Sequence, residues 1–240
     1  MRVTVIEHEA DAGPGFLADW LPAAGLTCDV VRPYRGETLP ARVEHGLIVL
    51  GGEASAWQDD DYPWLPATRD LIARAVADEV PTLGICLGAQ LMTLACGGTV
   101  TRGEHGLEIG VTPIDPLPAA SGDPILGHLR PGAPALQYHR DVCAVLPPGA
   151  VLLATGPTYP HQAYRLGAAA WAVQFHPEAT PEIFTSWTAA GAAGLAADGH
   201  DVAALDRAAE RARPRLAGAW RPLADGFAAV VTRQREFTRP

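Results

Sequence analysis

The sequence contains no lysine and no asparagine, so all 18 of its basic residues are arginines. The missing lysine excludes the Schiff-base chemistry of pyridoxal phosphate and aldol enzymes, and it excludes the lysine of a phosphate-binding loop. The missing asparagine excludes N-glycosylation and an asparagine donor in an oxyanion hole. Both amino acids have AT-rich codons, which makes a GC-rich genome the simplest explanation of their absence.

Long hydrophobic runs are also missing, because glycines interrupt the alanine-rich stretch 189–197, and Glu7 and Glu9 come too early for a signal peptide. The formal net charge is −9 without a basic cluster, so we expect neither nucleic acid nor a membrane as a partner. Neither metal-ligand nor disulfide spacing is found among the four cysteines, which are Cys28, Cys86, Cys96 and Cys143. We therefore predict a cytoplasmic protein with reduced thiols and no metal or cofactor.

Continuous apolar runs alternate with amphipathic stretches in the first hundred residues. The runs that we predict as strands are Val3–Ile6, Thr27–Val31, Gly46–Leu50 and Pro81–Ile85. The stretches that we predict as helices are Phe16–Leu21, the segment around Leu71, Ile72 and Val76, and Ala89–Cys96. Strands that read as continuous apolar runs rather than as alternating polar and apolar residues are typical of a parallel sheet covered on both faces. This pattern predicts an α/β fold, a three-layer sandwich with a mainly parallel central sheet.

The pattern changes at about Thr99, where shorter strands are separated by turns rich in proline and glycine. These strands are Val111–Ile114, Val151–Ala154 and Ala170–Phe175, and we expect them to add a mixed or antiparallel part to the same sheet. From Pro181 onward the pattern is helical. Asp201–Gln234 predicts one or two amphipathic helices, with breaks at Pro214 and Pro222 because proline disrupts a helix interior.

The segment Gly84-Ile85-Cys86-Leu87-Gly88 lies between a predicted strand and a predicted helix. It has the form Gly-x-nucleophile-x-Gly, in which small flanking residues permit a sharp turn that exposes the central side chain. At a helix N-terminus the unpaired N–H groups favour a thiolate, and the N–H of Leu87 would face a developing oxyanion. The alternative interpretation is a buried cysteine in a tight turn, which we favour for the other three cysteines.

A candidate base, His176, follows the predicted strand 170–175 in the segment Phe175-His176-Pro177-Glu178. Pro177 favours an extended chain, in which residues i and i+2 point the same way. Glu178 can therefore orient His176, and together with Cys86 these side chains would form a catalytic triad. Taken alone, the segment would be interpreted as a surface turn, but together with the predicted turn at Cys86 on a parallel sheet it favours the catalytic interpretation.

These two segments, residues 84–90 and 175–178, resemble the motifs of class I (triad-type) glutamine amidotransferases, whose fold is flavodoxin-like. The similarity is greatest to stand-alone relatives of the glutaminase domain of GMP synthase, and it covers residues 1 to about 195. We accordingly expect a glutaminase domain at 1–195 and a helical extension at 196–240 that packs on it. Further matching segments are residues 13–15, 47–52, 62–64, 108–110, 137–141 and 146–147.

The resemblance implies that Cys86 attacks the side-chain amide of glutamine, that His176 handles the proton and that Glu178 orients His176. It implies an oxyanion hole formed by N–H groups of Gly52 and Leu87. The residues that it implies for binding of the substrate are Gly51, Gln90, Glu108, Tyr138, His139 and Arg140. Three positions depart from the usual pattern, namely Glu53 after the glycine pair, Val111 after Glu-x-Gly, and Arg140 between His139 and Asp141.

The expected reaction is hydrolysis of glutamine through a cysteinyl γ-glutamyl thioester, with the ammonia passed to a separate synthetase subunit. One alternative is a self-contained hydrolase of γ-glutamyl peptides or other γ-glutamyl compounds. A second alternative is a catalytically silent binding or regulatory subunit that retains the fold. The arginines at 207, 211, 213 and 215 predict a solvated helix face, with a docking surface for a partner as the alternative.

Overall fold

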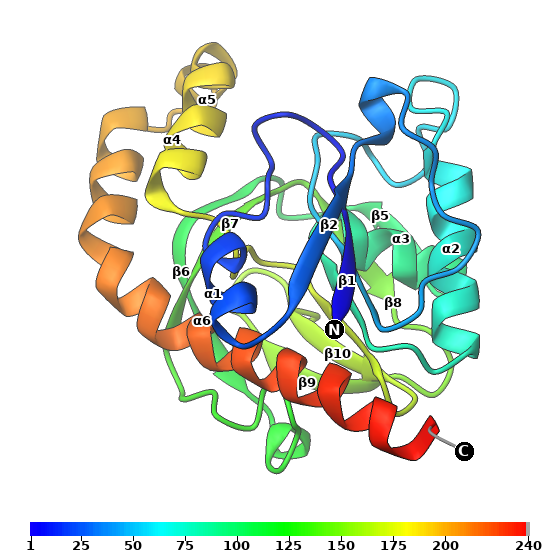
Figure 1. The fold of residues 1–240 in the computed structure, drawn as a ribbon. Helices are drawn as coiled ribbons and strands as arrows, with labels where there is room; N and C mark the ends of the chain where they lie inside the picture. Colours follow the sequence, from blue (N-terminus) through cyan, green and yellow to red (C-terminus); the bar gives the residue numbers. More distant parts are fainter. Residues whose placement is uncertain (239–240) are drawn as a thin grey trace.

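The computed structural model describes residues 1–238, with side chains through Arg233, and a nine-stranded sheet runs through its centre (Figure 1). Five neighbouring strands of this sheet are parallel, in the order β2 (Thr27–Val31), β1 (Arg2–Ile6), β3 (Gly46–Val49), β4 (Thr82–Ile85) and β11 (Ala170–Val173). The sheet continues with antiparallel strands in the order β10 (Ala163–Leu166), β9 (Val151–Thr155), β6 (Glu108–Pro116) and β7 (Ala133–His139). The predicted α/β fold is confirmed.

Helices cover both faces of the sheet, which gives the predicted three layers (Figure 1). On one face, α2 (Leu65–Ala77) and α3 (Leu87–Ala95) pack against alternate side chains of the central strands. The other face is covered by α1 (Leu17–Ala23), α4 (Pro181–Ala190) and α6 (Val202–Thr238), with the short α5 (Ala192–Ala197) between α4 and α6. Two single 3₁₀ turns lie at η1 (Pro33–Arg35) and η2 (Pro118–Ala120).

The central parallel strands were predictable because both of their faces are covered. Every residue of β3 and of β4 is buried, so each strand reads as an uninterrupted apolar run. The strands predicted at 111–114, 151–154 and 170–175 lie in this same sheet, where they correspond to β6, β9 and β11, as expected. In contrast, β5 (Thr99–Arg102) and β8 (Asp141–Val145) form a separate two-stranded sheet, for which the sequence patterns made no prediction. The chain passes from β7 to β8 through a single residue, Arg140, and this corner turns the second strand out of the main sheet.

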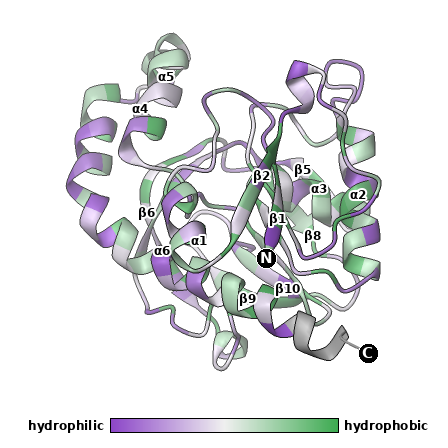
Figure 2. Cartoon of the chain, viewed as in Figure 1, coloured by the Kyte–Doolittle hydropathy of each residue, from purple (hydrophilic) through white to green (hydrophobic). Residues whose placement is uncertain are grey.

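The C-terminal helix α6 corrects the predicted breaks, because Pro214 and Pro222 both lie inside one continuous helix. Hydrophilic and hydrophobic residues alternate along it (Figure 2). Pro214 is exposed and Pro222 is half-buried, and the carbonyls four residues earlier belong to exposed positions, where water can satisfy them. The inward face holds the helix in place, since Trp220 and Phe227 are buried in the same core as α1 and the strands.

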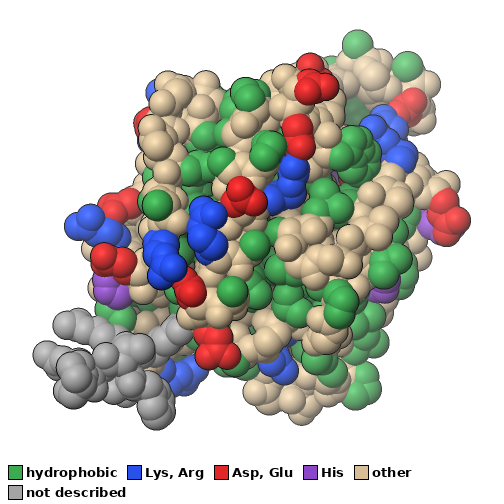
Figure 3. Space-filling view, turned by 90° about the vertical axis from the view of Figure 1, so that its right-hand side faces the viewer, with side chains coloured by type: hydrophobic (Ala, Val, Ile, Leu, Met, Phe, Trp, Pro, Cys, Tyr) green, Lys and Arg blue, Asp and Glu red, His purple; other side chains and the backbone are tan. Residues whose placement is uncertain are grey.

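The face that carries α2 has arginine and acidic side chains interspersed with hydrophobic ones (Figure 3). Ion pairs on this side join Arg69 to Asp59 at 2.6 Å and Arg42 to Asp78 at 3.6 Å. Within residues 1–238, no helix combines the length and the apolar character needed to cross a membrane.

Candidate active site

Cys86 occupies a strained turn between β4 and α3, with φ 50° and ψ −105°. Such a positive φ is uncommon for a residue with a side chain and is found at sites where the surrounding structure enforces it. The enforcement comes from the flanking glycines. A Cβ on Gly84 would lie 2.6 Å from the carbonyl oxygen of Gly88, and a Cβ on Gly88 would lie 2.0 Å from that of Val49. The glycine spacing read from the sequence is thus the spacing that the sharp turn requires.

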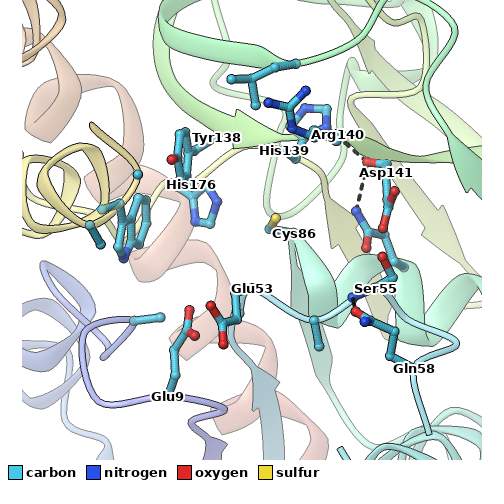
Figure 4. Close-up of a pocket in the computed structure, with 18 of the residues that line it drawn as sticks. Glu9, Glu53, Ser55, Gln58, Cys86, Tyr138, His139, Arg140, Asp141 and His176 are labelled. Atoms are coloured by element: carbon cyan, nitrogen blue, oxygen red, sulfur yellow. Dashed lines mark hydrogen bonds between the residues drawn. The ribbon is translucent and has the colours of Figure 1, made fainter. Parts of the chain in front are cut away.

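His176 and Glu178 lie just beyond the end of β11, the strand beside β4. The Nδ1 atom of His176 is 2.8 Å from Oε1 of Glu178, and both side chains are buried. The backbone N–H of His176 donates to the carbonyl of Leu136 on β7 at 2.9 Å, and the ring packs against Trp187 with centroids 4.6 Å apart. These contacts leave Nε2 of the imidazole as the nitrogen that faces Cys86 (Figure 4).

Charges around His176 favour its protonated form. Burial alone would lower the pKa of His176, but the carboxylate of Glu178 and the sulfur of Cys86 outweigh burial and raise the pKa to about 10. The imidazolium is stabilised by the carboxylate of Glu178 on one side and contacts the sulfur of Cys86 on the other. The arrangement therefore favours a protonated imidazole beside the sulfur.

The residues predicted to form an oxyanion hole, Gly52 and Leu87, come from two elements that meet beside Cys86. Leu87 is the first residue of α3, where N–H groups have no partner within the helix. Gly51 and Gly52 follow β3 and lie beside the catalytic side chains. A Cβ on Gly51 would come within 2.8 Å of Cε1 of His176, so only glycine fits there.

A cavity of about 630 Å³ opens at this edge of the sheet and includes Cys86 and His176 in its lining (Figure 4). Of the other residues predicted from the sequence, five line this cavity, namely Gly52, Gln90, Tyr138, His139 and Arg140. Gly51, Leu87, Glu108 and Glu178 lie around it without contributing to the lining. The sheet brings these residues together because the carboxyl ends of β3, β4 and β11 meet at one edge.

Gln90 and His139 converge on the same backbone carbonyl. Nε2 of Gln90 donates to the carbonyl of Asp141 at 2.9 Å, and Nδ1 of His139 donates to that carbonyl at 3.0 Å. The other ring nitrogen of His139 lies 3.1 Å from Oε2 of Glu108, which also accepts from Gln162 at 3.0 Å. Glu108 therefore supports His139 from behind, which differs from the direct contact with substrate that the sequence suggested.

Arg140 lines the cavity but already has an anionic partner. Its guanidinium lies 2.7 Å from a carboxylate oxygen of Asp198, and both side chains are nearly half exposed. Any carboxylate of a substrate would compete with Asp198 for this arginine.

A wall of carboxylates formed by Glu9, Asp11 and Glu53 also lines the cavity, and sequence reasoning missed it as a feature of the site. The carboxylates of Glu9 and Glu53 lie together, opposite His139 and Arg140 (Figure 4). Burial, followed by the charges of Asp11 and Glu53, raises the pKa of Glu9 to about 7. The positions of these residues in the sequence were a signal for this wall. Glu9 follows β1 and Glu53 follows β3, so both lie at the edge of the sheet where the site forms. Across the described part of the chain, no group of three or more potential ligands is placed to hold a metal ion.

The sequence profile of the family Glutamine amidotransferase class-I matches residues 17–189. A protein of Salmonella typhimurium named glutamine amidotransferase-like protein YfeJ is 31% identical over 187 residues, which cover 76% of this chain and 77% of the relative. The glutamine-hydrolyzing GMP synthase of Wolinella succinogenes is 34% identical over 160 residues. That match covers 64% of this chain but only 29% of the GMP synthase.

The crystal structure of a glutamine amidotransferase from Thermotoga maritima has the same fold, with a TM-score of 0.85 and 28% sequence identity. The superposition covers 95% of this chain and 97% of that one. The sequence match, the shared fold and the strained cysteine beside a buried histidine agree with one another. The chain belongs to the class I glutamine amidotransferase family and is a cysteine-dependent amide hydrolase.

Proposed function

We propose that this protein hydrolyses the side-chain amide of glutamine through a γ-glutamyl thioester on Cys86. The observation that carries the proposal is the geometry of the site. Cys86 sits in a strained turn at the N-terminus of α3, beside a buried His176 that Glu178 contacts at 2.8 Å, and this arrangement is typical of a nucleophilic cysteine with its base and orienting carboxylate. The cavity beside this pair supplies room for the substrate.

In the first half of the reaction, the Cys86 thiolate adds to the amide carbon and the carbonyl oxygen becomes an oxyanion. The N–H groups of Gly52 and Leu87 stabilise this oxyanion. The imidazolium of His176 gives its proton to the amide nitrogen, the C–N bond breaks and ammonia leaves. The carboxylate of Glu178 holds the imidazole in the tautomer that performs this transfer.

In the second half, neutral His176 removes a proton from water, and the resulting hydroxide adds to the thioester carbon. The C–S bond breaks, glutamate is released and the sulfur leaves as a thiolate beside the reprotonated imidazole. Gln90 has both of its amide hydrogens engaged by protein acceptors, so its Oε1 is the atom that it offers to a ligand. That oxygen is suited to accept a hydrogen bond from the amide nitrogen of glutamine.

The ammonia acceptor in this proposal is a separate synthetase subunit. The matched part of the Wolinella succinogenes GMP synthase is 29% of that protein, and the rest of that protein has no counterpart in the aligned part of this chain. A partner subunit that holds the acceptor substrate would use the ammonia that this protein releases.

The proposal is tested by measuring glutamate and ammonia release from glutamine by the purified chain. We expect release in equal amounts, inhibition by a glutamine-analogue electrophile that labels Cys86, and loss of activity in Cys86→Ala. If the labelled protein carries no adduct on Cys86 and the wild type releases no glutamate, the protein is a silent binding subunit.

A second candidate function is hydrolysis of larger γ-glutamyl amides without a partner. The cavity of about 630 Å³ is in the range of sites that enclose drug-sized ligands, and its lining includes the acidic wall at Glu9, Asp11 and Glu53. A cationic substituent on the amide nitrogen would suit this wall electrostatically.

The two candidates are separated by comparing kcat/KM for glutamine with kcat/KM for γ-glutamyl amides of neutral, anionic and cationic amines. A preference of more than about tenfold for a γ-glutamyl amide over glutamine would favour the partner-free hydrolase. A preference for glutamine, with its rate raised by a synthetase, would favour the amidotransferase.

A further inference from the structure

The side-chain amide of Gln174 lies behind the nucleophile, two residues before His176 along the chain. Its Nε2 atom is 3.8 Å from Sγ of Cys86, which is hydrogen-bond distance for sulfur. Its Oε1 atom is 3.4 Å from Nε2 of Gln90 and 3.8 Å from Sγ of Cys143. The side chain is only 2% exposed, so protein groups alone satisfy it. The contact with Gln90 helps to orient that residue, whereas the contact between Gln174 and the sulfur of Cys86 has no role yet assigned.

The neighbours of this amide determine which of its ends faces Cys86. The Nε2 atom of Gln90 can only donate a hydrogen bond, so it requires the oxygen of Gln174 opposite it. Burial raises the pKa of the Cys143 thiol to about 12, which keeps that thiol protonated and able to donate to the same oxygen. Two donors therefore hold Oε1, and the N–H₂ group is directed at the sulfur of Cys86.

We propose that Gln174 is a further catalytic residue, whose N–H stabilises the negative charge on the sulfur of Cys86. The inference rests on the proposed role of Cys86 as nucleophile. A hydrogen bond donated to a charged acceptor is worth more than one to a neutral acceptor. The contact therefore favours the thiolate over the thioester, in which the sulfur is uncharged, and it assists the departure of the sulfur when water cleaves the thioester.

The same amide couples the nucleophile to the substrate pocket. One hydrogen on Nε2 of Gln90 is bound by Asp141 and the other by Gln174, and this pairing turns the oxygen of Gln90 to the cavity. A single orientation of the Gln174 amide thus places an N–H donor at the sulfur of Cys86 and leaves the oxygen of Gln90 as the acceptor offered to the substrate.

The test uses two variants at this position. Gln174→Met keeps the length and volume of the side chain but removes the donor, and Gln174→Glu keeps the shape but places a carboxylate beside the sulfur. We measure the pH dependence of Cys86 alkylation by iodoacetamide with peptide mass spectrometry, together with kcat and KM for hydrolysis. Burial raises the pKa values of Cys28 and Cys96, so alkylation below pH 8 reports mainly on Cys86.

For Gln174→Met we expect the midpoint of the alkylation profile to move up by about one pH unit and kcat/KM to fall about tenfold. For Gln174→Glu we expect a larger shift, and activity that declines as pH rises through the titration of the new carboxyl group. The matched control is Gln137→Met, because Gln137 is another buried glutamine, whose amide donates to Gln162 at 2.9 Å. It should lower the melting temperature without moving the alkylation midpoint.

An unchanged alkylation midpoint in folded Gln174→Met, or wild-type activity of Gln174→Glu at pH 8, would overturn the inference. Failure of the proposed function has a different signature. In that case the wild type would hydrolyse neither glutamine nor γ-glutamyl amides, while the alkylation midpoint would still depend on Gln174.

Discussion

The imidazole of His176 is held between Glu178, 2.8 Å from its Nδ1 atom, and the sulfur of Cys86, which it faces with Nε2. Both protein partners favour a positive charge on the ring, and burial opposes it. Because the pair of partners outweighs burial, the histidine is poised as a proton donor to a leaving group.

Replacing Glu178 by glutamine removes the carboxylate that orients and charges His176. We expect Glu178→Gln to lower kcat by about 10³-fold, in line with the loss of an orienting carboxylate in other triads. The fold should persist, because the amide can still accept a hydrogen bond from Nδ1. Steady-state kinetics measure the effect, and unchanged kcat in a folded variant would contradict the assigned role.

The stability of the protein should fall as pH rises above neutrality. The pKa of His176 is about 10 in the folded protein and about 6.5 in an unfolded chain. A raised pKa contributes stability that is fully present below about pH 6.5 and is lost as pH rises through about 10. Urea unfolding from pH 6 to pH 10 should show a loss of a few kcal/mol. The loss should be smaller in Glu178→Gln, because the carboxylate of Glu178 is the largest of the causes that raise this pKa.

Glu9 should give a second pH effect, at lower pH. Its pKa is raised to about 7 by burial and by Asp11 and Glu53, so its contribution to stability is present below about pH 4.5 and is lost as pH rises through about 7. From pH 5 to pH 8 we expect Glu9 to add a loss of about 1–2 kcal/mol, allowing for partial exposure, to the loss that His176 causes in the same range. Glu9→Gln should lack this contribution. If the stability of the wild type and of Glu9→Gln depended on pH in the same way, the acidic wall would exert no repulsion on Glu9.

Gly51 should tolerate no side chain. The Cβ of Gly51→Ala would lie 2.8 Å from Cε1 of His176, so the imidazole must move away from Cys86. We expect kcat to fall at least about 10²-fold, since small displacements of catalytic groups have large effects. The control is Gly194→Ala in α5, where an added Cβ meets nothing within 4 Å and activity should be unchanged.

Arg140 should act on binding of substrate rather than on stability. Its ion pair with Asp198 is largely solvent-exposed, and exposed pairs contribute at most about 1 kcal/mol. We expect Arg140→Ala to raise KM several-fold with kcat unchanged. Asp198→Ala, which frees the guanidinium, should lower KM. Equal KM values in all three proteins would remove Arg140 from the binding site.

Local sequence patterns identified most of the groups in the site. The turn at Cys86 was predictable because close contacts require both of its glycines. Gly84 lies against the backbone of Gly88, and Gly88 lies against the backbone of Val49 on the neighbouring strand. His176 and Glu178 were predictable as a pair because proline at 177 favours an extended chain, in which both side chains share one face.

Local patterns did not predict the continuity of α6. Pro214 and Pro222 weaken a helix in isolation, yet burial of Trp220 and Phe227 against the sheet outweighs that cost. Local patterns also did not predict that β5 and β8 form a sheet of their own. A strand that changes sheet at a single residue does so because of its pairing partner, which lies far away in the sequence.

The sequence by itself determined the fold class, the sharp turn at Cys86 and the pairing of His176 with Glu178, since these depend on short-range spacing and on the continuous apolar runs of the central strands. Only the tertiary structure decided the surroundings of these groups. It placed Glu108 behind His139, paired Arg140 with Asp198, gathered Glu9 and Glu53 into one wall and directed the amide of Gln174 at Cys86. These groups come from loops and strands up to 88 residues apart, and no local pattern specifies which of their side chains meet.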